Sequence, residues 1–438
     1  MEECQTHLSD KDKTMLDQKK LKTFNEEQLP THISNFDHLG ERLTQKGLDI
    51  EALVNQIGVF QIAVPSWALG TGGTRFGRFP QGGEPSTLEE KIKDVGTLHA
   101  LNQSSGAISL HIPWDIPKDY KAIKDLANGL DIVFDAVNSN TFQDQPGSAH
   151  SYKFGSLSHI DSAVRKEAIR HNKEVIDHGV ELGSKALTVW LADGTSFAGQ
   201  HDFRGAFQRT LESLEEIYEH LPPDWKLLIE YKPYEPNFYS MVIPDWGTSH
   251  LLASKLGDQA TTLVDLGHHL PNTNIEQIVA LLMHLNKLGG FHFNDSKYGD
   301  DDLTVGSIKP YQLFLVFCEL VKGIQETVNP ELSWMIDASH NFKDPMEDLL
   351  QSVESIKIAH ARALLVNYNE LKVAQSQNDV VAAQSILQEA YRTDVRPLVK
   401  ESVYRRGGAL DAIEAYRSFD IRNQLIKKRG KHSKSTGL

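Results

Sequence analysis

Eight apolar, strand-like runs recur along this chain, and amphipathic helical segments separate them. Alternation of strands with helices predicts a parallel sheet, and dense Val, Ile and Leu are typical of strands buried on both faces. Eight strand–helix units are the number that closes a (β/α)8 TIM barrel, so we predict this α/β fold. The eight runs are Phe60–Pro65, Ala107–Ile112, Ile132–Ala136, Ala186–Trp190, Leu227–Tyr231, Thr261–Asp265, Gly290–Phe293 and Ser333–Asp337.

The segments outside these runs suggest extensions at both ends of the barrel. Residues 1–55 are polar with apolar residues at helical spacing, which predicts an N-terminal helical extension. The barrel is expected over residues 56–345. Residues 346–422 are expected to form a C-terminal helical extension that takes part in subunit contacts. Residues 423–438 form a basic stretch that we expect to be a disordered tail.

Charge and cysteine content narrow the classes of partner and compartment. Lys and Arg number 45 and Asp and Glu 59, giving a formal net charge of -14, which argues against a nucleic-acid partner. Cys4 and Cys318 cannot build a disulfide framework, and this favours a reducing compartment. No signal peptide is evident, and no apolar run approaches the roughly 20 residues of a membrane span. We therefore expect a cytoplasmic protein without a membrane partner.

Carboxylates and imidazoles gather at the ends of the last four runs. Because the ends of parallel strands meet at one mouth of a barrel, these side chains should lie close together. They suggest two metal sites that share one carboxylate. One site would use Glu230, Asp265, His292 and Asp337, and the other Asp265, His268, Asp300 and Asp302.

Taken one at a time, these residues have simpler interpretations. Glu230 and Lys232 point to the same face of a strand and could form a buried salt bridge. His268 could be a core histidine, and the acidic run at 300–302 could be a solvated face. Taken together, five carboxylates are neutralised by two divalent ions and Lys232, which favours metal binding. Oxygen donors with two imidazoles favour Mn²⁺, with Co²⁺, Mg²⁺ and Zn²⁺ as further candidates.

Aromatic residues follow the first four runs, where they are expected to wall a substrate pocket. His111 is a candidate acid/base, and Asp115 is near enough to orient it. The glycine-rich loop Gly70–Gly77 resembles a phosphate cradle only superficially, and it predicts an active-site lid or a plain connecting loop. The candidate substrate-binding residues are Trp67, Phe76, His111, Trp114, Phe142, Trp190 and Lys232.

Several motifs resemble the L-rhamnose isomerase family, over most of residues 40–420. They are Val64-Pro65-Ser66-Trp67, Gly70-Thr71-Gly72-Gly73-Thr74-Arg75-Phe76, Ser109-Leu110-His111-Ile112-Pro113-Trp114-Asp115, Leu263-Val264-Asp265-Leu266-Gly267-His268-His269, Met335-Ile336-Asp337 and the run from Gly290 to Asp302. This resemblance implies a metal-dependent aldose–ketose isomerase on a xylose-isomerase-like barrel, assembled as a homotetramer. Within this family, the chain most resembles bacterial members with broad aldose tolerance.

The resemblance also implies roles for individual residues. Glu230, Asp265, His292 and Asp337 match the ligands of a structural metal, and His268, Asp300 and Asp302 join the bridging Asp265 at a catalytic one. Lys232 matches a lysine that contacts the substrate, and Lys232, His111 and Asp337 are the candidate catalytic residues. The expected reaction interconverts L-rhamnose and L-rhamnulose, and other aldoses too, by hydrogen transfer between C1 and C2.

Two other functions fit part of the pattern. One is metal-dependent hydrolysis of DNA on a related barrel, which the acidic balance argues against. The other is a sugar- or metal-binding protein without turnover. The preferred aldose, the native metal, the hydride or enediol route and the reach of the Gly70–Gly77 loop into a neighbouring subunit stay open at the level of sequence.

Overall fold

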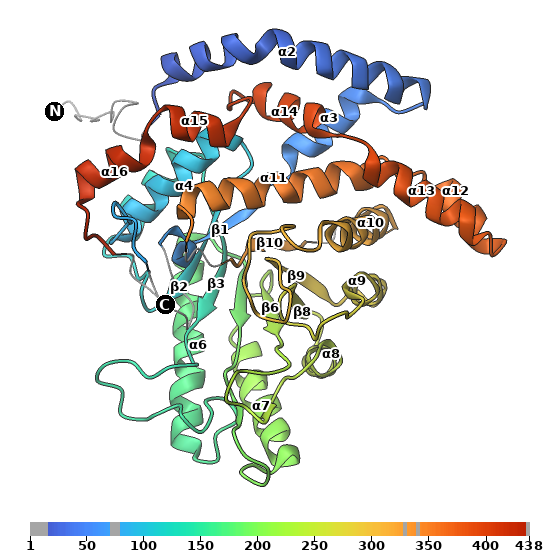
Figure 1. Cartoon of the computed structure of the whole chain (residues 1–438). Helices are drawn as coiled ribbons and strands as arrows, with labels where there is room; N and C mark the ends of the chain where they lie inside the picture. The colour runs from blue at the N-terminus through green and yellow to red at the C-terminus, as the bar shows by residue number, and fades with distance from the viewer. Residues whose placement is uncertain (1–15, 71–78, 327–330, 339–341, 435–438) are drawn as a thin grey trace.

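Eight parallel strands close a barrel in the computed structural model, which describes residues 16–70, 79–326, 331–338 and 342–434 (Figure 1). Around the barrel the strand order is β1-β10-β9-β8-β6-β4-β3-β2. Barrel strands that follow one another in the sequence are therefore adjacent in the barrel. The predicted TIM barrel is confirmed. Its strands are β1 (Ala63–Pro65), β2 (Ala107–Ile112), β3 (Val133–Ser139), β4 (Ala186–Val189), β6 (Lys226–Glu230), β8 (Ala260–Asp265), β9 (Leu288–Phe293) and β10 (Ser333–Ile336).

A helix follows each barrel strand and covers the outside of the sheet. Several of these helices begin at an aspartate whose carboxylate accepts a hydrogen bond from the first turn, as Asp161 and Asp202 do. The barrel helices are α4 (Leu88–Asn102), α5 (Tyr120–Asn128), α6 (Ser162–Leu182), α7 (Phe203–Tyr218), α8 (Trp246–Leu256), α9 (Ile275–His284), α10 (Pro310–Glu326) and α11 (Pro345–Leu364).

Two details of the barrel differ from the sequence-based expectation. We predicted that the barrel ends at residue 345, which is where α11 begins. However, α11 packs against α10 and α4 and takes the place of the eighth barrel helix, so the barrel includes it. In addition, β5 (Gly194–Thr195) and β7 (Ser240–Met241) pair antiparallel in a small separate sheet. Strands of two residues are too short for periodicity to reveal.

The inside of the barrel changes from apolar to polar along the strands. Leu228 and Leu263 pack in a small buried cluster, and Met335 packs in a second one. Side chains alternate between the two faces of a strand, so the residue two positions further on points the same way. That residue is Glu230 in β6 and Asp265 in β8. The strand pattern therefore directs these carboxylates into the mouth.

The N- and C-terminal extensions pack on each other at one side of the barrel (Figure 1). Leu43 and Ile57 from the first extension share a buried apolar cluster with Ala361 of α11 and Leu398 of the second. The hairpin of α12 and α13 projects from the body of the molecule. The extension helices are α2 (Gln18–Gln45), α3 (Ile50–Val59), α12 (Tyr368–Ser376), α13 (Val380–Arg392), α14 (Arg396–Tyr404), α15 (Ala412–Ser418) and α16 (Ile421–Arg429). Among the described helices, none has the length and apolar character needed to cross a bilayer.

The expected disordered tail from residue 423 is wrong for residues 423–429, which lie in α16. Arg429 is buried and binds both carboxylate oxygens of buried Asp94 at 2.7 Å. Its guanidinium also donates to the carbonyl oxygen of Gly83. The basic composition suggested solvation, but one of the basic side chains forms a paired, bidentate contact that holds the helix against α4.

Candidate active site

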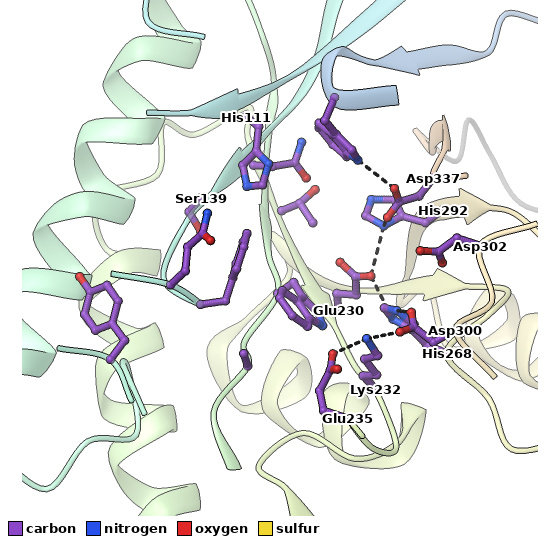
Figure 2. Close-up of a pocket in the computed structure, with 18 of the residues that line it drawn as sticks. His111, Ser139, Glu230, Lys232, Glu235, His268, His292, Asp300, Asp302 and Asp337 are labelled. Atoms are coloured by element: carbon purple, nitrogen blue, oxygen red, sulfur yellow. Dashed lines mark hydrogen bonds and ion pairs between the residues drawn. The ribbon is translucent and has the colours of Figure 1, made fainter. Parts of the chain in front are cut away.

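A cavity of about 760 Å³ opens at the carboxyl ends of the barrel strands and gathers most of the predicted site residues (Figure 2). Metal-ligand candidates lie on the β6–β10 side and aromatic residues on the β1–β4 side. The predicted residues among its lining are Trp67, His111, Phe142, Trp190, Glu230, Lys232, His268, His292, Asp300, Asp302 and Asp337. Phe76 lies outside the described residues. The described lining does not include Trp114, which packs edge-on against the His111 ring with centroids 4.8 Å apart.

Three carboxylates surround the Nδ1 atom of His292. This atom lies 3.2 Å from Oε1 of Glu230, 3.7 Å from Oδ2 of Asp265 and 3.6 Å from Oδ2 of Asp337. The Trp67 indole donates to Oδ1 of Asp337 at 2.9 Å and fixes the orientation of that carboxylate. Glu230, Asp265 and His292 offer ligand atoms that all lie within 4.8 Å of one another, and all three residues are buried.

The charges of this cluster are strongly coupled. Burial opposes protonation of His292, but Glu230, Asp337 and Asp265 outweigh it and raise the pKa of His292 to about 9. Burial, with Asp265 and Glu230 nearby, raises the pKa of Asp337 although His292 opposes the shift. The pKa of Glu230 is lowered, because His292 and His268 outweigh its desolvation. Without a cation the cluster retains protons that a metal would displace.

These residues fit a divalent cation. Oδ1 of Asp265 accepts from the Gly267 amide at 2.7 Å and from Nδ2 of Asn294 at 2.9 Å. Oδ2 of Asp265 has no hydrogen-bond partner among the described residues and faces His292. Buried carboxylates in excess over cationic side chains require compensation, and an oxygen-rich set with one imidazole suits a hard divalent ion.

A second group lies next to the first. Nε2 of His268 is 3.1 Å from Oδ1 of Asp300, and Nδ1 of His268 is 3.0 Å from the Tyr231 carbonyl oxygen. Asp300 and Asp302 have φ angles of 56° and 49°, in the left-handed region, which aspartate tolerates better than most residues. The neighbouring Asp301 carboxylate holds this turn by accepting from the amides of Lys297 and Tyr298.

Comparisons with known proteins identify the class of this barrel. Residues 109–312 match the model of the xylose isomerase-like TIM barrel. Over 396 residues, covering 90% of this chain, the sequence is 50% identical to a protein of Rhizobium meliloti (strain 1021) named "Probable sugar isomerase", of which the match covers 92%. A protein of Mesorhizobium japonicum with the same name is 49% identical over the same length, with coverage of 90% and 92%.

This chain belongs to the sugar isomerase family of those relatives. Among solved structures, an L-ribulose 3-epimerase covers 70% of this chain and 98% of its own length, with a TM-score of 0.51 at 16% identity. At that identity the likeness concerns the barrel fold alone.

Lys232 is buried at the mouth of the barrel and held between two carboxylates. Its ammonium lies 2.7 Å from Oδ2 of Asp300 and is also paired with Glu235. The same nitrogen is 5.2 Å from the centre of the Trp190 ring. Lys232 therefore links the second group of metal-ligand candidates to the aromatic wall.

Asp115 does not orient the His111 ring as the sequence suggested. Oδ2 of Asp115 accepts from the backbone amide of His111 at 2.9 Å and from the Ser66 hydroxyl, while Oδ1 is 2.7 Å from Nζ of buried Lys91. Asp115 therefore fixes the backbone at the ends of β1 and β2. Burial lowers the pKa of His111 to about 4 although Asp115 opposes the shift, so the imidazole is neutral at pH 7.

Replacing Lys91 with methionine is expected to lower the free energy of unfolding by about 3–5 kcal/mol. The reason is that Asp115, which is 1% exposed, would keep a buried charge without its cation. Chemical denaturation followed by circular dichroism measures this change. The exposed Lys121→Met is the control and should change the free energy of unfolding by less than about 0.5 kcal/mol. Equal stability of the two variants would contradict the expected role of the ion pair.

The sequence did not indicate some of the residues that line the cavity. Glu235 follows β6 in an irregular loop, where no periodicity indicates its direction. Ser139 ends β3, and Thr188 lies in β4 directly beside Asn138 of β3. In a sequence, small hydroxyl side chains within apolar strands are indistinguishable from ordinary core residues. The one usable signal was position, since Thr188 lies two residues before Trp190 on the same face.

Proposed function

We propose that this protein is a metal-dependent aldose–ketose isomerase that interconverts L-rhamnose and L-rhamnulose and accepts other aldoses. The convergence of Glu230, Asp265 and Asp337 on His292, at the wall of a cavity in a barrel of the sugar isomerase family, carries this proposal. The choice of L-rhamnose rests on the motifs that resemble the L-rhamnose isomerase family.

Two ions, with Mn²⁺ as the proposed native metal, would use two overlapping ligand sets. Divalent cations of this kind supply Lewis acidity that polarises sugar oxygens. The first set is Glu230, Asp265, His292 and Asp337, and the second is Asp265, His268, Asp300 and Asp302. Oδ2 of Asp265 is the atom available for ligation, since the Gly267 amide and Asn294 already occupy Oδ1.

Lys232 is proposed to stabilise negative charge that develops on a sugar oxygen. Its ammonium is desolvated and oriented by Asp300 and Glu235, so it needs little rearrangement to donate a hydrogen bond. In such a site a pre-oriented donor contributes far more than in water. Glu235 holds the lysine from the side opposite the metal ligands and is a positioning residue.

His111 is proposed to assist ring opening of the pyranose. Its neutral imidazole can accept a hydrogen bond from a sugar hydroxyl at neutral pH and orient that hydroxyl. The Trp67 and Phe142 rings flank it, with centroids 5.1 Å and 5.5 Å from the imidazole. These apolar faces would pack against the carbon skeleton of the sugar.

The proposed function is tested by incubating the protein with Mn²⁺ and single aldoses and following the ketose formed. L-Rhamnose, L-mannose, L-lyxose and D-allose make an informative panel, with ketose identity checked by chromatography. We expect L-rhamnulose from L-rhamnose. If another aldose is converted and L-rhamnose is not, the proposed aldose–ketose isomerase activity stands and the proposed substrate changes. Conversion of a ketose into its C3 epimer, without aldose–ketose exchange, would contradict the proposal.

A further inference from the structure

Buried hydroxyl groups line the wall of the cavity that faces the metal-ligand candidates. Ser139 and Thr188 line the cavity, and each is 2% exposed. Neither hydroxyl has a hydrogen-bond partner among the described residues, and the same holds for Nε1 of Trp190 beside them. These three groups come from β3, β4 and the residue that follows β4.

Buried hydroxyl groups without a hydrogen-bond partner are uncommon in the interior of a folded protein. A buried hydroxyl without a partner costs on the order of 1–3 kcal/mol, so most are satisfied by the protein or by a ligand. Elsewhere in this chain, buried serines do find partners: Ser156 and Ser158 both donate to Asp193 at 2.7 Å. Thr141 Oγ1 is also buried without a partner, but Thr141 does not line the cavity. What distinguishes Ser139 and Thr188 is that they lie on the cavity wall.

The arrangement gives the cavity two chemically different sides. Figure 2 shows Ser139 and His111 across the cavity from Glu230, His268, Asp300 and His292. A sugar whose C1–C2 end lies at the carboxylate and imidazole side must extend its other carbons toward β3 and β4. The groups that such a chain brings there are hydroxyls, each able to donate and accept one hydrogen bond or more.

We propose that Ser139 and Thr188 bind hydroxyl groups on the sugar carbons beyond C2, and thereby favour sugars that carry those hydroxyl groups over analogues that lack them. This inference rests on the proposed isomerase function. It assigns a specificity role to two residues that contribute no charge and no metal ligand. Trp190, whose Nε1 is the third unsatisfied donor, would share in the same contacts.

The test compares Ser139→Ala and Thr188→Val on sugars that differ by one hydroxyl. L-Mannose and L-rhamnose differ only at O6, and 4-deoxy-L-rhamnose lacks O4 as well. We expect each variant to lose about tenfold in kcat/KM on L-mannose, the equivalent of one hydrogen bond of about 1.4 kcal/mol. On the sugar that lacks the bound hydroxyl, each variant should lose less than about twofold in kcat/KM. The reason is that this sugar has no hydroxyl with which the wild-type side chain could bond.

Stability separates this role from a structural one. Because neither hydroxyl bonds to the described protein, Thr188→Val should keep the melting temperature of the metal-loaded protein or raise it. The exposed Ser162→Ala is the control and should retain wild-type kinetics on all sugars. Equal losses on every sugar, no losses, or a lowered melting temperature in both variants would overturn the inference. A wild-type protein that converts no sugar would instead overturn the proposed function.

Discussion

Replacing Asp265 with asparagine is expected to lower kcat for sugar isomerisation on the order of 10³-fold or more. The two donors on Oδ1, the Gly267 amide and Asn294, would retain the amide oxygen of the new side chain. Its NH2 group would then occupy the position of Oδ2, which faces His292. An amide nitrogen does not ligate a divalent cation, so the shared ligand of both proposed sites is lost while the shape of the side chain is preserved.

Metal content and steady-state rates measure this effect together. The Asp265→Asn variant should bind fewer than two ions per chain after dialysis against Mn²⁺, with an unchanged circular dichroism spectrum. The exposed Asp258→Asn makes the same chemical change away from the cavity and should match the wild type. An Asp265→Asn variant with wild-type kcat would show that Asp265 has no part in the reaction.

Replacing Lys232 with methionine is expected to lower kcat about 10²- to 10³-fold, the usual effect of removing one pre-oriented donor. Methionine has a similar length and no charge, so the cavity keeps its volume. The metal-ligand candidates all remain, and the variant should therefore bind as many ions as the wild type. This separates the role of the ammonium from the role of the metals.

The measurement for Lys232→Met combines kcat, KM and metal content. KM should change much less than kcat, because the proposed contact is strongest in the transition state. Lys255→Met, an exposed change on α8, is the control. Loss of the bound metal in Lys232→Met would instead indicate that the lysine stabilises the ligand set, through Asp300, and not the reacting sugar.

The sequence was most informative at the ends of the predicted strands. Glu230 and Asp265 lie at such ends, and because the ends of parallel strands meet at one mouth, the sequence predicted that they lie together. The structure adds that Leu228 and Leu263, two residues earlier on the same face, pack inside the barrel. The fold was equally accessible, because eight alternating units have few other solutions. His268 and Asp300 lie in turns beyond the strands, and their direction depends on φ angles and amide contacts that spacing does not reveal.

Composition was a poorer guide than spacing. The net negative charge argues against a nucleic-acid partner, but it does not reveal what single aspartates do. Asp49, Asp119 and Asp245, for example, cap helices through their carboxylates. The basic C-terminal stretch suggested solvation, but Arg429 is paired with Asp94. In each case one specific contact decides the role of the charge, and a sum over residues does not contain that information.

The central claim is that carboxylates and histidines at the barrel mouth hold divalent metal that sugar isomerisation requires. Titrating Mn²⁺ into fully chelated protein, while measuring bound metal per chain and the rate of ketose formation from L-rhamnose, tests it most directly. We expect no turnover without metal and a rate that rises until two ions are bound. Full turnover by the metal-free protein would contradict the account.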